Sequence, residues 1–434
     1  MLKFKRWLGG SLSGICAILI LSACGLFGGP AEPTATPAAP VTLKYISLNQ
    51  FAGVEDALIK QFQTEHSNLK IDKEEFRSDP LQYLTNTPPP DMITIAPSLW
   101  LDQAIEQGLV TDITDIWQQA GLKDAYPANL RALSERNGKQ YFLPIGYSWN
   151  AIYYNKQIFA QYNLQPPKNW DEFMQICDTL LANGVTPLAL SGRNAFMASL
   201  WIDYLDMRLN GPDFHHQLET GQIAYEDAKV RAVFELWHSL SDKGYFLADS
   251  SNLQSLSSLL AIIRGDNGQL GNQKAAMTLS GPFFLNELPD KFRSELDFFP
   301  FPTIEPTIPA GEVVFSLGYM VPASAAHRQE ALTFLTYLGS APAQAIFVQN
   351  APNGLYAPAQ APAKLSDLPA TLQQGMQLVQ NAQTVDTPYF ISVNQKLQSA
   401  MEDMLRQLLV GPTSSKPFDL DALLANLEQA RQDK

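Results

Sequence analysis

The sequence holds few of the residues on which metal, redox and nucleotide chemistry depend. Of its 434 residues, only five are histidine and three are cysteine. No GxxxxGK[ST], HExxH, CxxC or GxSxG motif occurs, and no GxGxxG follows a strand pattern. The sequence therefore shows no motif of a phosphate-binding loop, a zinc protease, a redox cysteine pair or a serine nucleophile. His215 and His216 are adjacent and would point apart on a helix or a strand, so we expect no metal, no cofactor and no catalytic residue.

Positive charge is also scarce. Lysine and arginine number 30 against 43 aspartates and glutamates, which gives a formal net charge of -13. Nucleic acid and anionic membranes both require a concentrated basic surface, and no run of basic residues occurs after residue 6. We therefore expect no nucleic-acid partner.

Apolar residues make up 46% of the chain, which suffices for packed cores and excludes a disordered or fibrous protein.

The N-terminus has the composition of an export signal followed by a lipid attachment site. Three basic residues precede an apolar stretch that is too short to span a membrane comfortably. The stretch ends in Leu21-Ser22-Ala23-Cys24, which resembles the bacterial lipobox. This resemblance implies that residues 1–23 are a signal peptide and that Cys24 carries lipid as the first mature residue. An ordinary signal peptide or an uncleaved anchor helix is the alternative.

Residues 24–40 form a tether in this interpretation. Four prolines among glycine, alanine and threonine cannot bury a core. A proline-rich chain extends by about 3.1 Å per residue, which would hold the body up to roughly 50 Å from the bilayer. We expect a chain that is anchored to the membrane and does not span it.

The cysteine count fits an exported protein without disulfides. Cys16 lies in the signal and Cys24 would carry lipid, which leaves Cys177 alone. Cys177 has Phe173 and Leu180 at helical spacing around it. We interpret it as a buried structural thiol in preference to a nucleophile.

From residue 41 the pattern alternates between strands and helices. Val41–Leu48, Leu69–Glu74 and Asp91–Ala96 are short strand patterns with helical stretches between and after them. Such alternation predicts an α/β domain with a largely parallel sheet. Because ligands of such sheets bind at the carboxyl ends of strands, the loops Asn49–Gly53 and Pro97–Trp100 are candidate binding loops.

Later segments continue the mixture of helices and strands. Tyr141–Tyr154 carries two aromatic-rich strand patterns, and Trp170–Asn183 and Ala228–Lys243 are helical. Val313–Val321 is a further strand pattern, and a late helix stops at Gly411-Pro412. Trp170 and Trp237 fall on the apolar faces of the two helices, so we assign both to the core.

Several segments match one family in order. They are Pro90–Ile93, Leu109–Ile113, Gly138–Pro144, Ile152–Phe159, Pro167–Phe173, Gly184–Leu190, Lys274–Met277, Gly281–Phe283 and Glu330–Leu335. The series resembles the extracellular solute-binding proteins of family 1, the carbohydrate-binding receptors of ABC importers that are similar to maltose-type binding proteins. The resemblance covers nearly all of residues 41–350. Residues 76–91 depart from it, because they are shorter and richer in proline than the helix-containing stretch usual there.

The resemblance implies an α/β fold of two lobes with the ligand bound in a cleft between them. The chain would cross between lobes two or three times, near Tyr147–Asn150, Ala310–Ser316 and Asn350–Tyr356. Closure on the ligand would be a hinge motion. The implied division is 41–147 plus 316–351 for the N-terminal lobe and 148–315 plus 352–434 for the C-terminal lobe.

The resemblance also implies the partners and the location. These are a small-molecule carbohydrate, an ABC permease and its ATPase, and the cell membrane, which the chain would reach through lipid on Cys24. The receptor would be a monomer outside the cytoplasm, on the periplasmic or extracellular face.

A sugar ring suggests which residues would bind it. Aromatic rings cover the apolar face of a pyranose, and planar polar side chains pair with its hydroxyl groups. The candidate platforms are Trp100, Tyr147, Trp149, Trp201, Phe283 and Tyr319. The candidate hydroxyl partners are Asn49, Asn150, Arg193, Asp203 and Asn353. A core position is the alternative for Trp201, and a solvated helix acid is the alternative for Asp203.

Two other functions stay open at this point. One is a secreted glycoside-active enzyme that uses Asp203 and a second carboxylate. The other is the same binding fold with a polyamine, a peptide or a phosphorylated compound as ligand. The sequence does not name the sugar.

Overall fold

A computed structural model describes residues 40–48, 52–77, 80–248, 250–263, 274–351, 356–409 and 418–433. Residues 40–434 form one compact unit, distinct from residues 1–39. The signal sequence, Cys24, Asn49 and Asn353 lie outside the described residues. All that follows concerns the unit that begins at Pro40.

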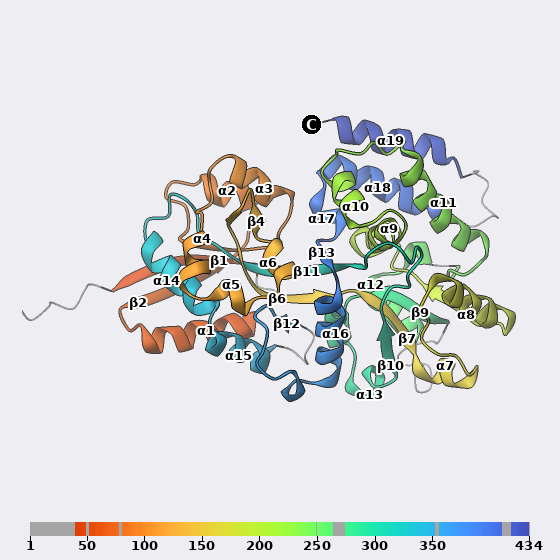
Figure 1. Ribbon diagram of the computed structural model, residues 1–434, viewed down its shortest axis with the longest axis horizontal. Helices are drawn as coiled ribbons and strands as arrows, with labels where there is room; N and C mark the ends of the chain where they lie inside the picture. Colours follow the sequence, from red (N-terminus) through yellow and green to blue (C-terminus); the bar gives the residue numbers. More distant parts are fainter. Residues whose placement is uncertain are drawn as a thin grey trace, which may run out of the picture. The chain divides into compact units, whose positions relative to one another are not determined.

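Seven strands form the first sheet, which we take as the centre of the first lobe, except that β13 pairs with the first residues of β11 and is counted with the second lobe (Figure 1). Their order is β12-β6-β11-β3-β1-β2, with β13 paired to β11. The strands are β1 (Val41–Ser47), β2 (Leu69–Glu75), β3 (Met92–Ile95), β6 (Leu143–Trp149), β11 (Gly311–Met320), β12 (Ala357–Pro358) and β13 (Thr384–Asp386). β1 runs parallel to β2 and β3, and β13 runs parallel to β11, but the pairs β11–β3, β11–β6 and β12–β6 are antiparallel. The sheet is therefore mixed, and the prediction of a largely parallel sheet holds only for β1 to β3.

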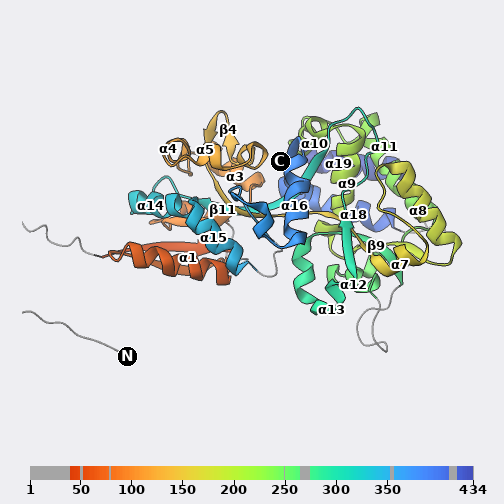
Figure 2. The same cartoon turned by 60° about the horizontal axis from the view of Figure 1, so that its bottom comes forward.

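Short helices and one small hairpin surround this sheet. They are α1 (Ala52–Glu65), α2 (Pro80–Thr85), α3 (Leu99–Glu106), α4 (Thr114–Gln119), α5 (Leu122–Ala125), α6 (Ala128–Ala132), α14 (Arg328–Leu338), α15 (Ala341–Asn350), β4 (Glu135–Arg136) and β5 (Lys139–Gln140). Val54, Leu58 and Phe62 of α1 are buried in the core. Figure 2 shows α1 and α15 side by side. The proline-rich stretch 76–91 contains the six-residue helix α2.

The second lobe is built on a four-stranded sheet of order β10-β7-β9-β8. Its strands are β7 (Ala151–Asn155), β8 (Thr186–Ala189), β9 (Ala275–Ser280) and β10 (Leu296–Phe299). Its α-helices are α7 (Lys156–Gln161), α8 (Trp170–Ala182), α9 (Ala195–Leu209), α10 (Pro212–Glu219), α11 (Ala228–Asp242), α12 (Ser255–Ala261), α13 (Asp290–Arg293), α16 (Ala370–Asn381), α17 (Tyr389–Ser392), α18 (Gln395–Leu408) and α19 (Leu420–Gln432). The short 3-10 turns are η1 (Ser250–Asn252), η2 (Pro282–Glu287) and η4 (Leu365–Asp367).

The core of the second lobe forms around α9, which is buried on every side from Met197 to Arg208. A helix that is covered all round must find partners for its polar residues inside the protein. Trp170, Cys177 and Trp237 lie in this core, so their predicted core positions are confirmed. Burial raises the pKa of the Cys177 thiol, which keeps it in the neutral, unreactive form.

Two strands connect the sheets. β6 of the first sheet leads directly into β7 of the second, with Asn150 between them. β11 pairs with β3 and β6, and its first residues pair with β13 and contact α9. The Asn150 amide donates to the carbonyl of Val313 at 3.1 Å, and the Tyr204 hydroxyl donates to the Asn150 carbonyl at 2.8 Å. Asn150 thus ties the two connecting strands to α9.

Within the described ranges, no single helix has the length and apolar character needed to cross a membrane. The pair α14 and α15 passes that test by length and composition only when the two are taken together, across a bend of 67°.

Candidate functional site

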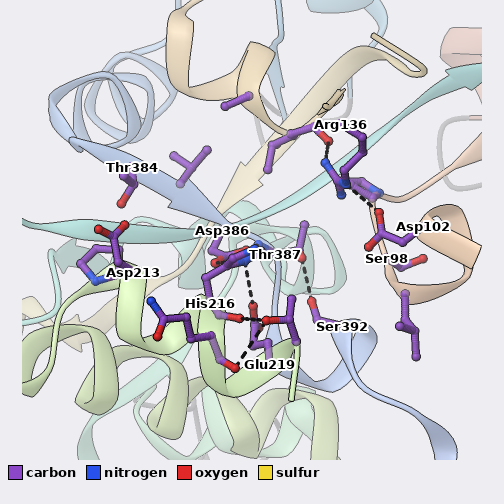
Figure 3. Close-up of a pocket in the computed structure, with 18 of the residues that line it drawn as sticks. Ser98, Asp102, Arg136, Asp213, His216, Glu219, Thr384, Asp386, Thr387 and Ser392 are labelled. Atoms are coloured by element: carbon purple, nitrogen blue, oxygen red, sulfur yellow. Dashed lines mark hydrogen bonds and ion pairs between the residues drawn. The ribbon is translucent and has the colours of Figure 1, made fainter. Parts of the chain in front are cut away.

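Residues of both lobes line a cleft of about 500 Å³ (Figure 3). The first lobe contributes Pro97, Ser98, Leu99, Asp102, Ala132, Leu133 and Arg136. The second contributes Pro212, Asp213, His216, Gln217, Glu219, Thr220, Gln222, Thr384, Val385, Asp386, Thr387 and Ser392. Three of these residues come from the loop Pro97–Trp100, which follows β3 as expected for a ligand loop of a parallel sheet.

Charged groups occupy both walls of the cleft. On the first wall, Arg136 Nε donates to Asp102 Oδ1 at 2.6 Å. On the second, His216 Nδ1 lies 3.9 Å from Glu219 Oε2 and 3.7 Å from Asp386 Oδ2. A hydrogen bond to Asp386 is the main cause that raises the pKa of His216. With Asp213 also present, carboxylates outnumber basic groups along this lining.

Two hydroxyl groups on opposite walls lack hydrogen-bond partners. Ser98 Oγ, at the residue before α3, and Thr384 Oγ1, on β13, are both buried and unpaired. Ser98 has the position of a helix N-cap, yet its side chain does not bond to the helix. A buried polar atom without a partner is costly, unless a water molecule or a ligand completes it. The pair therefore marks the cleft as a place for a ligand that carries hydrogen-bonding groups.

Half-buried phenylalanines join the two lobes. Phe315 of β11 packs against the core of the first lobe, and Phe196 of α9 packs against the core of the second. Their rings meet edge to face, with 6.1 Å between centroids. Phe283 packs against both cores. Aromatic surface is thus present where the lobes meet.

Three of the predicted site residues remain at least partly accessible to solvent. Phe283 is half-buried in the position just described. Arg193 is exposed in the turn before α9, where its backbone N–H donates to the Leu253 carbonyl at 3.1 Å. Trp100 is half-buried on α3 and packs against the core of the first lobe. Trp100 is not among the residues that line the cleft described above.

Four predicted aromatic platforms lie in the core. Tyr147, Trp149, Trp201 and Tyr319 are at most 2% exposed. Trp201 stacks on Trp237, with 6.4 Å between centroids, and so takes the core position that was its alternative. Because side chains two apart share one face of a strand, Tyr147 and Trp149 enter the same buried layer of β6. Trp149 also lines a separate cavity of about 270 Å³, together with Tyr153 and Pro282.

Two predicted hydroxyl partners are also buried. The side-chain amide of Asn150 already donates to the Val313 carbonyl, in the strand connection described above. Asp203 Oδ1 accepts from the backbone N–H of Tyr389 at 2.9 Å and lies 3.1 Å from His215 Nε2. Asp203 is therefore neither a cleft residue nor a solvated helix acid here. Asn49 and Asn353 fall on residues that the structure does not describe.

Sequence reasoning missed most of the cleft lining. Ser98, Asp102, Arg136 and Thr384 are common surface residue types, and no spacing relates positions 98 and 384. Val313, Phe315 and Leu317 are spaced by two and share one face of a strand, and an apolar face of this kind indicates burial. Phe196 follows Asn194, whose side chain accepts from Met197 N and caps α9. This capping signal was the one local clue to the start of that helix.

Comparisons with known proteins agree on one family. A family model described as bacterial extracellular solute-binding protein matches residues 46–345. An uncharacterized ABC transporter extracellular-binding protein of Pyrococcus horikoshii is 28% identical over 356 residues, which is 76% of each chain. The multiple sugar-binding protein of Streptococcus mutans is 26% identical over 317 residues, which is 63% of this chain and 67% of its own.

Solved structures share the fold. The bacterial solute receptor AcbH, described as having an exclusive preference for β-D-galactopyranose, superposes with a TM-score of 0.78 at 21% identity, over 91% of this chain and 97% of AcbH. Ligand-free RafE from Streptococcus pneumoniae gives a TM-score of 0.70 at 17% identity, over 91% of this chain and 99% of RafE. These likenesses show a two-lobe α/β binding-protein fold. Since the family model also spans most of the chain, this protein belongs to the bacterial extracellular solute-binding proteins.

Proposed function

We propose that the chain is the lipid-anchored receptor of an ABC importer, and that it captures a sugar, an oligosaccharide or a glycoside between its lobes. The multiple sugar-binding protein and the galactose and raffinose receptors among its relatives support a carbohydrate ligand. The observation that carries the proposal is the pair of unpaired hydroxyls, Ser98 and Thr384, on opposite walls of one cleft. A sugar hydroxyl can both donate to and accept from such groups.

The ligand would bridge the two lobes. Polar groups of Asp102, Arg136 and His216 line the same cleft as the unpaired hydroxyls and suit a ring with several hydroxyl groups. Phe196, Phe283 and Phe315 lie at the junction of the lobes, outside this lining, and would cover the apolar face of that ring once the lobes close around it. Contacts to both lobes favour the closed form, so binding would be coupled to hinge closure.

Of the residues named from the sequence, we retain five as ligand contacts. Phe283, Arg193 and Trp100 keep accessible surface near the lobe junction or on the helix that borders the cleft. Asn49 and Asn353 stay predictions, because the first follows β1 and the second precedes β12 in the chain.

We propose lobe boundaries at 147/148 and 315/316, as expected from the family. The last crossing is better placed after Ala361 than at residue 352. In support, Ala357 pairs with Tyr147 of β6, and the Ala361 N–H donates to the Ala125 carbonyl of the first lobe at 3.1 Å.

The receptor would bind its ligand without turnover. The carboxylate named for a glycosidase, Asp203, is fully buried and bonded to His215 and Tyr389, so it is not placed to protonate a substrate. Lipid on Cys24 would hold a monomeric receptor at the membrane, where the permease and its ATPase receive the ligand.

One observation favours a second ligand class. Asp102, Asp213, Glu219 and Asp386 line the cleft against Arg136 and His216. This acid excess suits a cation, so a polyamine is the alternative ligand of the same site.

Intrinsic tryptophan fluorescence of the purified full chain tests the proposal. The chain is titrated with monosaccharides, oligosaccharides and glycosides, with spermidine and amino acids as controls. We expect a saturable change with one sugar class and recovery of that sugar unaltered. A response to spermidine alone would select the polyamine alternative, and consumption of a glycoside would overturn the receptor assignment.

A further inference from the structure

Below the second wall of the cleft, a buried histidine meets three carboxylates. His215 of α10 is fully buried, and so are Asp203 and Asp206 of α9. Its Nδ1 lies 2.9 Å from Asp206 Oδ2, and its Nε2 lies 3.1 Å from Asp203 Oδ1 and 3.5 Å from Glu219 Oε1. Three carboxylates from two neighbouring helices thus surround one imidazole.

The cluster carries more negative charge than its histidines can neutralise. Glu219 also lies near His216, which in turn lies 3.7 Å from Asp386. Among the described residues, these four carboxylates form ion pairs with His215 and His216 and with no lysine or arginine. With all four carboxylates ionised, two negative charges would remain even if both imidazoles were protonated. Buried charge without a counter-charge is costly, so the cluster calls for a further cation.

Two oxygen atoms in the cluster are left without hydrogen bonds. Asp203 Oδ2 and Glu219 Oε1 are buried and unpaired. The side chain of Asp203 is fully buried and that of Glu219 is 3% exposed. Each carboxylate points at the same nitrogen, His215 Nε2, and each retains an oxygen with acceptor capacity.

The geometry fits a metal ion between these groups. One ligand atom from each of Asp203, His215 and Glu219 lies within 4.8 Å of the others. Two donors that each lie about 2.1 Å from a tetrahedral zinc ion are about 3.4 Å apart. The observed separations from His215 Nε2, 3.1 and 3.5 Å, bracket that value. We propose that Asp203, His215 and Glu219 bind one divalent transition-metal ion, with Zn²⁺ as the suitable probe.

The surroundings complete the site. Metal-bound histidines generally donate their second ring N–H to a carboxylate, which fixes the tautomer and the ring orientation. Asp206 occupies that place at His215 Nδ1. Glu219 is also part of the cleft lining, so an ion can enter from the cleft. His215 is buried while His216 is exposed, as expected for adjacent residues, and the partners of His215 are Asp203 and Asp206 of α9 and Glu219 of α10.

Zinc binding to the metal-stripped full chain is measured by titration calorimetry, and Co²⁺ absorption reports the coordination geometry. We expect one ion per chain, a tetrahedral cobalt spectrum and a higher melting temperature with Zn²⁺. Glu219→Gln and Asp203→Asn should each weaken Zn²⁺ binding more than about 100-fold, and Asp206→Asn by about 10- to 100-fold. Glu219→Gln and Asp203→Asn each remove a different proposed ligand. The test therefore stays informative even if one of the two variants fails to fold.

One surface substitution serves as a matched control. His327→Gln removes a half-exposed histidine that lies 3.3 Å from Asp91, outside the cluster. It should retain zinc affinity within a few-fold, because this ring does not belong to the proposed ligand set. Absence of stoichiometric binding, or affinity that survives Glu219→Gln but is lost in His327→Gln, would overturn the assignment.

Discussion

Gly375 of α16 lies directly against the indole ring of Trp149. A β-carbon placed on Gly375 would stand 2.4 Å from Cδ2 and Cε2 of that ring, which is closer than any normal contact. Trp149 is the last residue of β6, in the segment where the chain crosses between the lobes. Helix α16 can close over this crossing only because residue 375 has no side chain.

We expect Gly375→Ala to destabilise the protein. The added methyl group meets a buried aromatic ring, and overpacking of this kind costs about 1–3 kcal/mol. Chemical denaturation followed by tryptophan fluorescence measures the change. Gly53→Ala is the matched control, because Gly53 also lies in a helix but has open space around it. That variant should be neutral or stabilised by up to about 1 kcal/mol, and equal losses in both variants would contradict the packing argument.

A buried ion pair at the start of β11 provides a second prediction. Arg208 Nη2 lies 2.7 Å from Glu312 Oε1, and both side chains are at most 4% exposed. The Tyr204 hydroxyl also lies 3.0 Å from Glu312 Oε2 and shares its one proton between Glu312 and the Asn150 carbonyl. Glu312→Ala leaves the Arg208 charge buried and unpaired, so we expect a loss of about 3–5 kcal/mol in the free energy of unfolding.

The exposed pair of Lys44 and Glu74, 3.5 Å apart, is the control for that loss. Glu74→Ala should change the free energy of unfolding by less than about 1 kcal/mol, since surface ion pairs contribute little. A small effect of Glu312→Ala, comparable to that of Glu74→Ala, would show that the buried pair is not required.

Glu428 makes stability depend on acid pH. Hydrogen bonds from Arg431, despite burial that opposes them, lower the pKa of Glu428 to about 2. In the unfolded chain the pKa of a glutamate is about 4.3. The contribution of Glu428 is therefore complete above about pH 4.5 and declines as the pH falls toward 2. We expect Glu428→Gln to cost about 2 kcal/mol at pH 7 and progressively less below pH 4.5.

Urea denaturation of both proteins between pH 7 and pH 3 measures this difference. A gap between wild type and Glu428→Gln that stays constant over that range would mean that the charge on Glu428 is not what stabilises the fold.

The unpaired hydroxyls predict an effect on ligand binding without an effect on stability. Thr384→Val keeps the shape of the side chain and removes its Oγ1, and Ser98→Ala removes the matching hydroxyl. Each should weaken sugar binding about 5- to 10-fold, the equivalent of one hydrogen bond. The melting temperature should not fall, because neither hydroxyl has a partner to lose.

Thr278→Val is the control for this pair, because Thr278 of β9 is also buried and unpaired but is not among the cleft residues. It should bind the sugar like wild type. Normal affinity in both Thr384→Val and Ser98→Ala would place the ligand elsewhere.

Local patterns were sufficient for most of the fold. The strands near residues 41, 69 and 91 and the helices near 170 and 228 were predicted within a few residues. Apolar periodicity decides such elements, because the same residues that set the pattern also form the core. The core positions of Trp170, Cys177 and Trp237 follow for the same reason.

The site was harder to predict, because it depends on distant parts of the chain. Tyr147 and Trp149 have the composition of a sugar platform, but strand alternation turns them inward. Asp203 looked like a surface acid, yet α9 is covered on all sides and pairs it with His215. Ser98 and Thr384 are nearly 300 residues apart in the sequence, and they line one cleft only once both lobes are folded.

The central claim is that one sugar molecule binds between the lobes and leaves unchanged. Native mass spectrometry of the purified chain, incubated with a mixture of sugars, glycosides, spermidine and amino acids, tests it most directly. The account predicts one sugar or glycoside per chain, with the mass of the intact compound after release. A bound polyamine or amino acid, a cleaved glycoside, or no bound compound at all would contradict it.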